Sequence, residues 1–257
     1  MAERILAVTG GASGIGRAVA ELAAASGARV ALLDVSSSTS DVARQLRDAG
    51  SPKTLALNCD VSDPNAVESA FSAIAADLGP VDGLFTSAGI DRGGMAHEIT
   101  PEQWRLVMAI NLDGTFFAVQ CALRQMMESR GGSIVCCSSP ASFVAFAAGG
   151  ASAYSASKGA VSALVRTLAV DYASYAIRVN ALVPGSTETP LMWSNVEPNL
   201  QPAVREVLSG EIPLGRLARA EEPARAAMWL LSAESSYVTG SHLVCDGGTL
   251  AKGSVSV

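Results

Sequence analysis

Residues 9–16 read Thr9-Gly10-Gly11-Ala12-Ser13-Gly14-Ile15-Gly16, directly after the apolar run Ile5–Val8 and at the start of a helical pattern. A glycine-rich turn between a strand and a helix lets backbone approach a pyrophosphate, and the helix N-terminus adds N–H groups and a positive dipole. Such turns are common, so the place of this one at the first strand–helix junction carries most of the weight. The octet predicts a nucleotide site, and its candidate binding residues are Gly10, Ser13, Gly14, Ile15 and Gly16.

Short apolar runs alternate with longer helical patterns along the rest of the 257 residues. This alternation predicts an α/β fold with a doubly wound, Rossmann-like parallel sheet and helices on both faces. The predicted strands are Ile5–Val8, Arg29–Leu33, Thr54–Leu57, Gly83–Thr86, Ser133–Cys137, Arg178–Val183 and His242–Val244. The predicted helices lie near residues 14–26, 40–49, 64–78, 101–129, 153–173 and 221–233. No repeat or charged linker divides the chain, so one domain over residues 1–257 is expected.

Two of these helices carry clear start signals, and one region breaks the alternation. Asp63-Pro64 and Thr100-Pro101 each place a capping residue before a proline at the first helical position. Residues 185–217 are irregular and rich in proline, near the carboxyl edge of the predicted sheet. They are interpreted as a lid or binding loop, with a tolerated surface excursion as the alternative.

An acid follows the glycine octet at the spacing that a dinucleotide site needs. Asp34 ends the second predicted strand, 18 residues after Gly16. A carboxylate there accepts hydrogen bonds from an adenosine ribose and repels a 2′-phosphate. No Arg or Lys directly follows it, because Val35-Ser36-Ser37-Ser38 comes next. NAD is therefore favoured over NADP, with a plain strand-end turn residue as the lesser interpretation of Asp34.

Composition excludes several other classes of protein. A net charge of −6 without clustered Lys or Arg argues against a nucleic-acid partner. The N-terminus lacks the pattern of a signal peptide, and no apolar stretch is expected to be long enough to span a bilayer. The five cysteines and two histidines show no metal-ligand spacing. A cytoplasmic protein with reduced thiols, no metal and no membrane partner is predicted.

Tyr154 and Lys158 are the strongest candidates for chemistry. Four residues is slightly more than one helical turn, so both side chains emerge from one face of a helix. There the lysine ammonium would lower the pKa of the tyrosine hydroxyl toward a value useful in proton transfer. Taken alone, such a pair is more often an ordinary amphipathic helix surface.

Together, the glycine octet, the Tyr-x-x-x-Lys pair and the alternating pattern resemble the short-chain dehydrogenase/reductase family over essentially the whole chain. Asp60-Val61 resembles its adenine-contacting pair, and Asn111 its active-site asparagine. Ser138-Ser139 ends the fifth strand as the family's catalytic-serine segment does. Asn180-Ala181-Leu182-Val183-Pro184-Gly185 is similar to the segment beside the nicotinamide, and Thr187 or Thr189 to the threonine that contacts the carboxamide. Cys245-Asp246-Gly247-Gly248 resembles the C-terminal Asp-Gly-Gly.

The sequence departs from the family pattern in two places. The usual Asn-Asn-Ala-Gly after the fourth strand reads Thr86-Ser87-Ala88-Gly89, which keeps Ala88 and Gly89 near the ribose and leaves Thr and Ser as weaker substitutes for the two amides. The segment from serine to tyrosine is slightly long, with Ala147-Ala148-Gly149-Gly150 before the tyrosine. Ser139 is the favoured catalytic serine because it directly follows the strand, and Ser142 and Ser138 stay open.

The resemblance implies reversible hydride transfer between NAD(H) and a secondary alcohol or ketone. Tyr154 would be the general acid/base, Lys158 would lower its pKa and hold the nicotinamide ribose, and Ser139 would bind the substrate oxygen. Asn111 would position a water that links Lys158 to solvent. The alternatives are a reductase of 3-oxoacyl thioesters, and a nucleotide-binding regulator without catalysis.

Two further expectations concern the substrate and the assembly. Residues 90–95, 143–146 and 192–193 are mainly apolar pocket candidates, which would suit a cyclic, aromatic or aliphatic alcohol; packing of the lid explains them equally well. The helix near 153–173 is small or apolar around most of its circumference, and one sheet face needs only one apolar stripe. A homo-oligomer is expected, and the family's usual homotetramer fits that expectation.

Overall fold

The computed structural model describes residues 3–92, 94–129, 131–146 and 149–252. Within them, seven strands form a parallel sheet in the order β3-β2-β1-β4-β5-β6-β9. Their bounds are β1 Ile5–Thr9, β2 Arg29–Asp34, β3 Thr54–Asn58, β4 Gly83–Thr86, β5 Gly132–Cys137, β6 Ile177–Pro184 and β9 His242–Cys245. The predicted doubly wound parallel sheet is confirmed.

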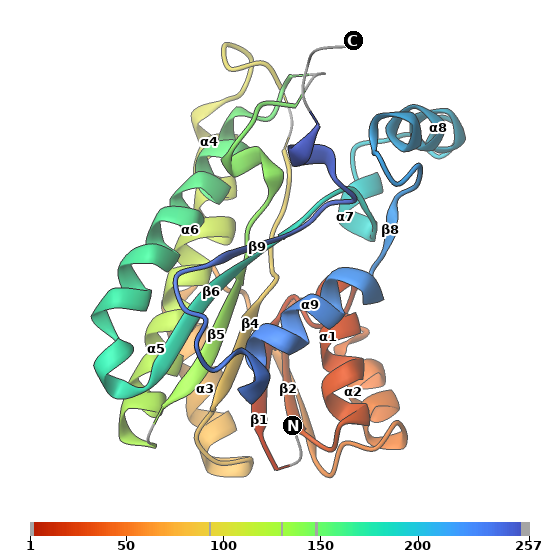
Figure 1. The fold of residues 1–257 in the computed structure, drawn as a ribbon. Helices are drawn as coiled ribbons and strands as arrows, with labels where there is room; N and C mark the ends of the chain where they lie inside the picture. Colours follow the sequence, from red (N-terminus) through yellow and green to blue (C-terminus); the bar gives the residue numbers. More distant parts are fainter. Residues whose placement is uncertain (1–2, 93, 130, 147–148, 253–257) are drawn as a thin grey trace.

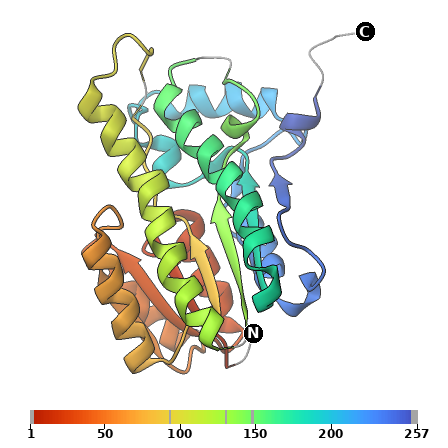
Figure 2. The ribbon, with the colours of Figure 1, turned by 90° about the vertical axis from the view of Figure 1, so that its left-hand side faces the viewer.

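Helices cover both faces of this sheet. One layer holds α3 (Pro64–Asp77), α4 (Pro101–Met108), α5 (Gly114–Glu128) and α6 (Ser152–Asp171). The other holds α1 (Gly14–Ala25), α2 (Thr39–Asp48) and α9 (Glu221–Leu231). Figure 1 shows the two layers on opposite sides of the sheet, and Figure 2 faces the layer that contains α5 and α6.

Burial on both faces explains why the central strands are continuously apolar. Every residue of β1 and β4 is buried. Neighbouring residues of a strand point to opposite faces, so Ala7 packs with α3 and α5 while Leu6 and Val8 pack with α1 and α9. The sheet thus separates two hydrophobic cores and holds the carboxyl ends of its strands in fixed places.

The predicted starts of α3 and α4 are confirmed. The Asp63 side chain accepts a hydrogen bond from the backbone N–H of Asn65. Thr100 and Gln103 form a reciprocal capping box at α4, with Pro101 in the first turn. These caps satisfy N–H groups that have no partner inside the helix.

The predicted helix near residues 101–129 is present, and it is more apolar than expected. α4, a π-helical turn η1 (Ala109–Asp113) and α5 run on from Pro101 to Glu128. An 18-residue window of this run has a mean hydropathy of 1.6, so the helix is long and apolar enough to cross a membrane, judged by length and composition alone. The expectation that no stretch reaches that length is therefore wrong. Half of the window is buried, and α5 packs against α3 and the sheet, so core packing accounts for its apolar character.

Residues 185–217 contain helices that the sequence analysis did not predict. β7 (Thr187–Glu188) is followed by α7 (Pro190–Trp193) and α8 (Gln201–Glu211), and β8 (Ala218–Arg219) returns to pair with β7. Arg205 of α8 donates two hydrogen bonds to Glu188, at 2.7 and 3.0 Å, and its guanidinium lies 5.0 Å from the centre of the Trp193 ring. Figure 1 shows this segment beyond the carboxyl ends of the strands.

The strand order reverses between β1 and β4, and such a switch point is where parallel α/β sheets bind ligands. The glycine turn after β1 and residues 87–89 after β4 lie against each other there. A Cβ on Gly10 would lie 2.7 Å from the backbone nitrogen of Ala88, so only glycine fits. The topology therefore creates a crevice at the position of the predicted nucleotide site.

Candidate active site

A cavity of about 1260 Å³ opens at this crevice. It extends from the glycine turn, past the ends of β4 and β5, to the segment that contains α7 and α8. Most of the predicted site residues line it: Gly10, Ser13, Gly14, Ile15, Asp34, Asp60, Val61, Ala88, Gly89, Ser139, Tyr154, Lys158, Pro184, Gly185, Thr187 and Thr189. Gly16 and Asn111 lie behind the wall instead.

The glycine turn is shaped by close backbone contacts. Gly10 and Gly14 adopt φ angles of 65° and 53°, a conformation that favours glycine. A Cβ on Gly16 would collide with the Gly10 carbonyl oxygen, so this residue closes the turn without facing the cavity. The first turn of α1 is thereby presented to the cavity with Gly14 and Ile15 at its wall.

Asp34 holds the same turn from the end of β2. Its Oδ2 accepts a hydrogen bond from Ala12 N–H at 2.9 Å, and its Oδ1 accepts one from Ser36 N–H at 3.0 Å. A carboxylate has about four lone-pair positions, so capacity remains for two ribose hydroxyls. At the neighbouring strand, Asp60 lines the cavity and Val61 packs on Gly114, where a Cβ would lie 2.6 Å from Val61 Cγ2.

The departure at Thr86-Ser87 is compensated by a different residue from the one expected. Thr9 Oγ1 accepts hydrogen bonds from the backbone N–H groups of Ser87, at 3.2 Å, and Ala88, at 3.3 Å. Thr86 Oγ1 is buried and has no partner among the described residues. Thr86 therefore does not replace a missing amide within the described residues, and Thr9 fixes the turn from β1. Ser87 lines the cavity, so its predicted role as a substitute stays a prediction.

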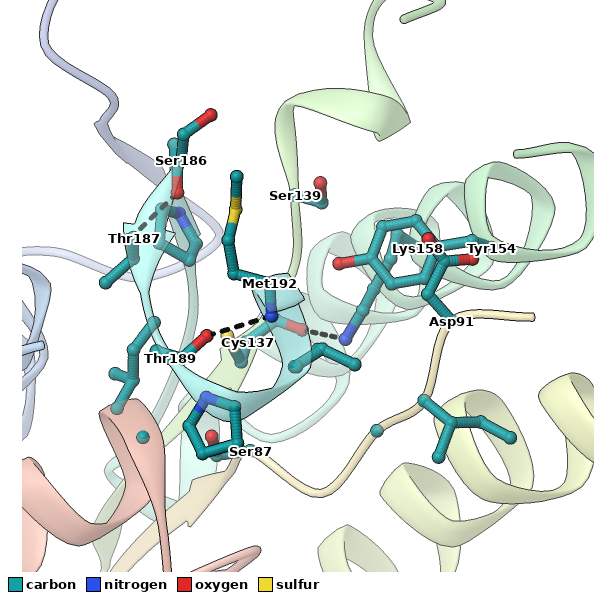
Figure 3. A pocket seen from close by; sticks show the side chains of 18 of the residues that line it. Ser87, Asp91, Cys137, Ser139, Tyr154, Lys158, Ser186, Thr187, Thr189 and Met192 are labelled. Atoms are coloured by element: carbon teal, nitrogen blue, oxygen red, sulfur yellow. Dashed lines mark hydrogen bonds between the residues drawn. The ribbon is translucent and has the colours of Figure 1, made fainter. Parts of the chain in front are cut away.

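Tyr154 and Lys158 lie in the first two turns of α6 and both face the cavity (Figure 3). The Lys158 ammonium lies 5.8 Å from the centre of the Tyr154 ring and donates a hydrogen bond to the Cys137 carbonyl at 2.7 Å. Burial raises the pKa of Tyr154, and the Ser139 hydroxyl lowers it by less. Burial also lowers the pKa of Lys158. The pKa of Tyr154 thus moves opposite to the predicted direction, because desolvation by burial is its largest cause.

The three candidate serines have different surroundings. Ser139 lines the cavity just before the 3-10 turn η2 (Pro140–Ser142), where its hydroxyl accepts a hydrogen bond from Ala141 N–H at 3.2 Å. Ser142 does not line the cavity: its hydroxyl donates to the Ser139 carbonyl and lies 2.8 Å from that of Ser138. Ser138 is buried and lies 2.7 Å from the Ser162 hydroxyl. Of the three, Ser139 alone faces the cavity without being tied into this hydroxyl cluster. Ala147 and Ala148, part of the stretch that makes this segment long, lie outside the described residues.

Asn111 is buried in the π-helical turn and reaches the wall from behind. Its Oδ1 accepts a hydrogen bond from Ile90 N–H at 2.8 Å, and its Nδ2 donates to the Ile90 carbonyl at 2.9 Å and to Ser157 Oγ at 3.1 Å. A Cβ on Gly89 would lie 3.3 Å from Asn111 Oδ1 and 3.7 Å from Lys158 Nζ. The asparagine therefore fixes the loop after β4 next to Lys158.

The segment after β6 closes the cavity from the opposite side. Thr187 Oγ1 donates a hydrogen bond to the Gly185 carbonyl at 2.9 Å, and Thr189 Oγ1 accepts one from Met192 N–H at 3.3 Å as the cap of α7. Thr189 also lies against Gly14, where a Cβ would be 3.2 Å from its Cγ2. The two threonines thus span the gap between the sheet and the glycine turn.

The predicted pocket walls are correct in part. Ile90, Val144, Phe146 and Met192 line the cavity, together with residues of α8 that the sequence analysis missed: Val204, Val207, Leu208 and Glu211. Phe143 packs on His242 instead, with ring centres 5.7 Å apart, and Trp193 stacks on Arg205. Asp91 is a carboxyl in this wall that the reading of residues 90–95 as mainly apolar overlooked. An acid two residues after Gly89 was the signal that could have identified it.

Residues 10–249 match the family model described as Enoyl-(Acyl carrier protein) reductase. With the sheet order and the cavity described above, this match shows that the chain belongs to the short-chain dehydrogenase/reductase family.

Two relatives and one solved structure show how closely the chain is related to known members of the family. Cis-4-hydroxycyclohexanecarboxylate dehydrogenase of Sinomonas cyclohexanicum is 42% identical, over 97% of this chain and 98% of the relative. NAD-dependent glycerol dehydrogenase of Listeria innocua is 36% identical, over 97% and 95%. The crystal structure of a short-chain type dehydrogenase/reductase from Mycobacterium marinum superposes with a TM-score of 0.91 at 33% identity, covering 98% of this chain and 97% of that one.

Proposed function

We propose that this protein is an NAD-dependent dehydrogenase/reductase that transfers a hydride between NAD(H) and a secondary alcohol or ketone. The observation that carries the proposal is that Ser139, Tyr154 and Lys158 face the same cavity as Asp34 and the glycine turn. One end of that cavity fits a dinucleotide and the other end holds a proton donor. Relatives named as dehydrogenases of hydroxyl compounds support the reaction class.

The described residues fit a nicotinamide dinucleotide. Gly10, Gly14 and Gly89 line the cavity with backbone, and a Cβ on each would lie 2.7, 3.2 and 3.3 Å from Ala88, Thr189 and Asn111, so side chains there would displace the walls. Asp34 is an acceptor for ribose hydroxyls and a repulsive neighbour for a 2′-phosphate, which supports NAD over NADP. Asp60 and Val61 would flank the adenine, and Pro184, Gly185, Thr187 and Thr189 would border the nicotinamide, whose C4 carries the hydride.

The roles of the catalytic residues follow from what each side chain can donate or accept. Ser139 would hold the substrate oxygen by a hydrogen bond, and Tyr154 would exchange a proton with that oxygen. Lys158 would hold the nicotinamide ribose and favour the ionised form of Tyr154. Its ammonium donates one hydrogen bond, to the Cys137 carbonyl at 2.7 Å, and has two further N–H groups for these roles. Asn111 would position a water behind Lys158, from the turn that also anchors Ile90.

An absorbance assay at 340 nm tests the proposal. Purified protein is incubated with NAD or NADP and a panel of cyclic, aromatic and polyol alcohols. We expect turnover with NAD, a lower kcat/KM with NADP, and a loss of about 10²–10⁴ in kcat for Tyr154→Phe with retained cofactor binding. Asp34→Ala should lower the ratio of kcat/KM with NAD to kcat/KM with NADP. Equal rates for Tyr154→Phe and the unaltered protein would refute the proposal, and a preference for NADP would refute the role of Asp34.

Two other functions make different predictions in the same assay. A reductase of acyl-thioester ketones would act with NADPH on a 3-oxoacyl thioester rather than on the alcohol panel. The description of the matched family model names an acyl-carrier-protein substrate, although its enoyl group is a carbon–carbon double bond and not a ketone. A silent nucleotide-binding regulator would bind NAD without turning over any substrate. Asp34 argues against the NADPH-dependent thioester reductase. A silent regulator is opposed by the complete set of Asn111, Ser139, Tyr154 and Lys158.

The proposal includes an assembly and a location. The outward face of α6 carries Ala156, Ala163 and Val170, spaced seven residues apart and exposed in a single chain. A second copy would cover this face, and a homotetramer is the state we propose, without nucleic-acid or membrane partners. The five cysteines are free thiols, which supports a cytoplasmic location.

A further inference from the structure

Asp91 is a carboxyl group in the cavity wall that the proposed catalytic roles leave unused. It follows Ile90 at the end of the loop after β4, and it lines the same cavity as Tyr154 (Figure 3). The side chain is half-buried, and its Oδ1 is buried without a hydrogen-bond partner among the described residues. Burying a carboxyl oxygen without a donor costs free energy, so such a group calls for a ligand that supplies one.

The backbone on either side of Asp91 is held in place. Before it, Asn111 makes two hydrogen bonds with the backbone of Ile90. After it, Gly94 N–H donates to the Gly150 carbonyl at 2.7 Å, and Gly94 pairs with Ala151, the residue that precedes α6. The loop that carries Asp91 is thus tied to the start of the helix that carries Tyr154.

A third contact joins Asp91 to the segment that closes the cavity. The Asn195 side chain, just after α7, donates a hydrogen bond to the Asp91 carbonyl at 3.2 Å. Three separate elements therefore position one residue, although its own carboxyl oxygen has no partner. A site that is fixed in advance binds its ligand with less loss of conformational entropy.

Charge and polarity around Asp91 restrict what the ligand can be. Its neighbours in the wall include the apolar side chains of Ile90 and Met192, and burial raises the pKa of Asp91. Asp91 also contributes to the raised pKa of Tyr154, which places its charge close to the proton-transfer group. On the side of the cavity away from the nucleotide end, the described charged residues besides Asp91 and Lys158 are Glu211 and Lys252, both exposed. An anionic substrate would meet like charge here, whereas a hydroxyl group would donate a hydrogen bond.

We propose that Asp91 binds a second hydroxyl group of the substrate, so that the enzyme prefers neutral diols and polyols over simple alcohols and over hydroxy acids. The carboxyl accepts a hydrogen bond from the hydroxyl that does not react, while Ser139 and Tyr154 engage the one that does. Asp91 is then a specificity-determining residue. This inference rests on the proposed alcohol dehydrogenase function and names the substrate class of that site.

The test compares kcat/KM for cyclohexanol, for the 1,2-, 1,3- and 1,4-cyclohexanediols, and for 4-hydroxycyclohexanecarboxylate. The unaltered enzyme should prefer at least one diol over cyclohexanol by about tenfold or more, chiefly through KM, and should use the carboxylate least. Asp91→Ala should remove the preference for the diol and lower kcat/KM for cyclohexanol far less than for the diol. Asp91→Asn, nearly isosteric and still an acceptor, should retain part of it.

A binding measurement and a matched control separate specificity from general damage. The affinity of the preferred diol for the enzyme loaded with NADH, followed by nicotinamide fluorescence, should fall about tenfold in Asp91→Ala. Glu211→Gln removes another carboxylate from the cavity wall and should leave the ratio of diol to cyclohexanol unchanged. Turnover of cyclohexanol with no diol preference in the unaltered enzyme, or an unchanged preference in Asp91→Ala, would overturn this inference alone. No turnover of any alcohol would overturn the dehydrogenase function and the inference with it.

Discussion

Ser138, Ser142 and Ser162 form a connected group of hydroxyls at the cavity wall, and Ser138 and its neighbour Ser139 both line the cavity. The Ser142 hydroxyl donates to the Ser139 carbonyl, and the Ser138 hydroxyl also approaches the Lys158 carbonyl at 3.3 Å. The cluster therefore connects the turn that bears one proposed catalytic residue to the helix that bears two others. The cluster holds backbone, whereas Ser139 lines the cavity, where we propose that it binds the substrate oxygen.

Substitution of these serines should separate the two roles. Ser139→Ala should lower kcat by about 10²–10³, because a hydrogen bond to the reacting oxygen is strongest in the transition state. Ser142→Ala should change kcat by much less and lower the thermal midpoint, since it removes the hydroxyl that bonds the Ser139 carbonyl and the Ser138 hydroxyl and leaves only the Ser142 N–H, at 3.0 Å, as a donor to that carbonyl. Steady-state kinetics and thermal unfolding of both variants distinguish these effects. A larger loss of kcat in Ser142→Ala would reverse the assignment.

At the scale of single residues, the sequence predicted identities better than environments. The glycine turn, Asp34, Tyr154 and Lys158 could be proposed as site residues because their chemistry and spacing are local, and the structure places them at one cavity. The pKa of Tyr154 could not, because its direction depends on desolvation by segments far away in the chain. The position of Asp91 depends in the same way on contacts with Gly150 and Asn195.

At the scale of elements, one carboxylate attaches the end of the segment that closes the cavity, residues 185–217, to the body of the fold. Glu222 in the first turn of α9 accepts two hydrogen bonds from Arg216, each 2.7 Å long, and one from Arg219 N–H at 2.8 Å. The Arg216 side chain and the Arg219 backbone lower the pKa of Glu222 to about 2. The end of the segment, at β8, is thereby attached to α9.

This lowered pKa predicts how the attachment depends on pH. Between the pKa of about 2 in the folded protein and the ordinary value of 4.5, the unfolded chain binds the proton and the folded chain does not. The stabilisation by Glu222 is therefore complete above that ordinary value and is lost as the pH falls toward 2. Glu222→Gln should lower the thermal midpoint at pH 7, and the difference from the unaltered protein should shrink between pH 5 and 3.

Glu221→Gln is the control, because Glu221 lies in the same helical turn and makes no hydrogen bond or ion pair within the described residues. It should alter the thermal midpoint little at any pH. A difference between Glu222→Gln and the unaltered protein that stays constant from pH 7 to pH 3 would contradict the proposed linkage.

The elements themselves were predictable where periodicity was strong. All seven strands of the main sheet and the helices that flank it lie within one or two residues of their predicted bounds. α8 was not predicted, because Pro198 and Pro202 suggested irregular chain, although Pro202 falls in the first turn, where a proline costs little. The small ladder of β7 and β8 joins residues about 30 positions apart, and no local pattern reveals such a pairing.

The whole molecule presents one surface that the fold of a single chain does not explain. Val170 on α6 is 78% exposed, and it follows Ala156 and Ala163 along the same face of the helix. Phe116 and Met127 of the neighbouring α5 are also exposed. Apolar faces on two adjacent helices are typical of surfaces that pack against a second copy.

A charge on this face should dissociate the assembly. Each chain has a mass of 26.2 kDa, and light scattering during size-exclusion chromatography should give four times that value for the unaltered protein. Val170→Glu should shift the mass toward that of smaller species, because burying an unpaired carboxylate is costly. Leu200→Glu, an exposed apolar position just before α8, should not. A monomeric mass for the unaltered protein would refute the proposed tetramer.

The π-helical turn at Ala109–Asp113 has a consequence for how this molecule can be altered. A π turn holds one residue more than an α-helix of the same rise, and π turns recur at functional sites despite their weaker geometry. Deleting one residue there would restore a regular α-helix from Pro101 to Glu128, and it would rotate Asn111 relative to one of its flanking helices. The helix would become regular, and the two hydrogen bonds between Asn111 and the Ile90 backbone would be lost. Selection for thermal stability would then favour the shorter, regular helix, and selection for turnover would favour the π turn, so the presence of one residue would decide between the two.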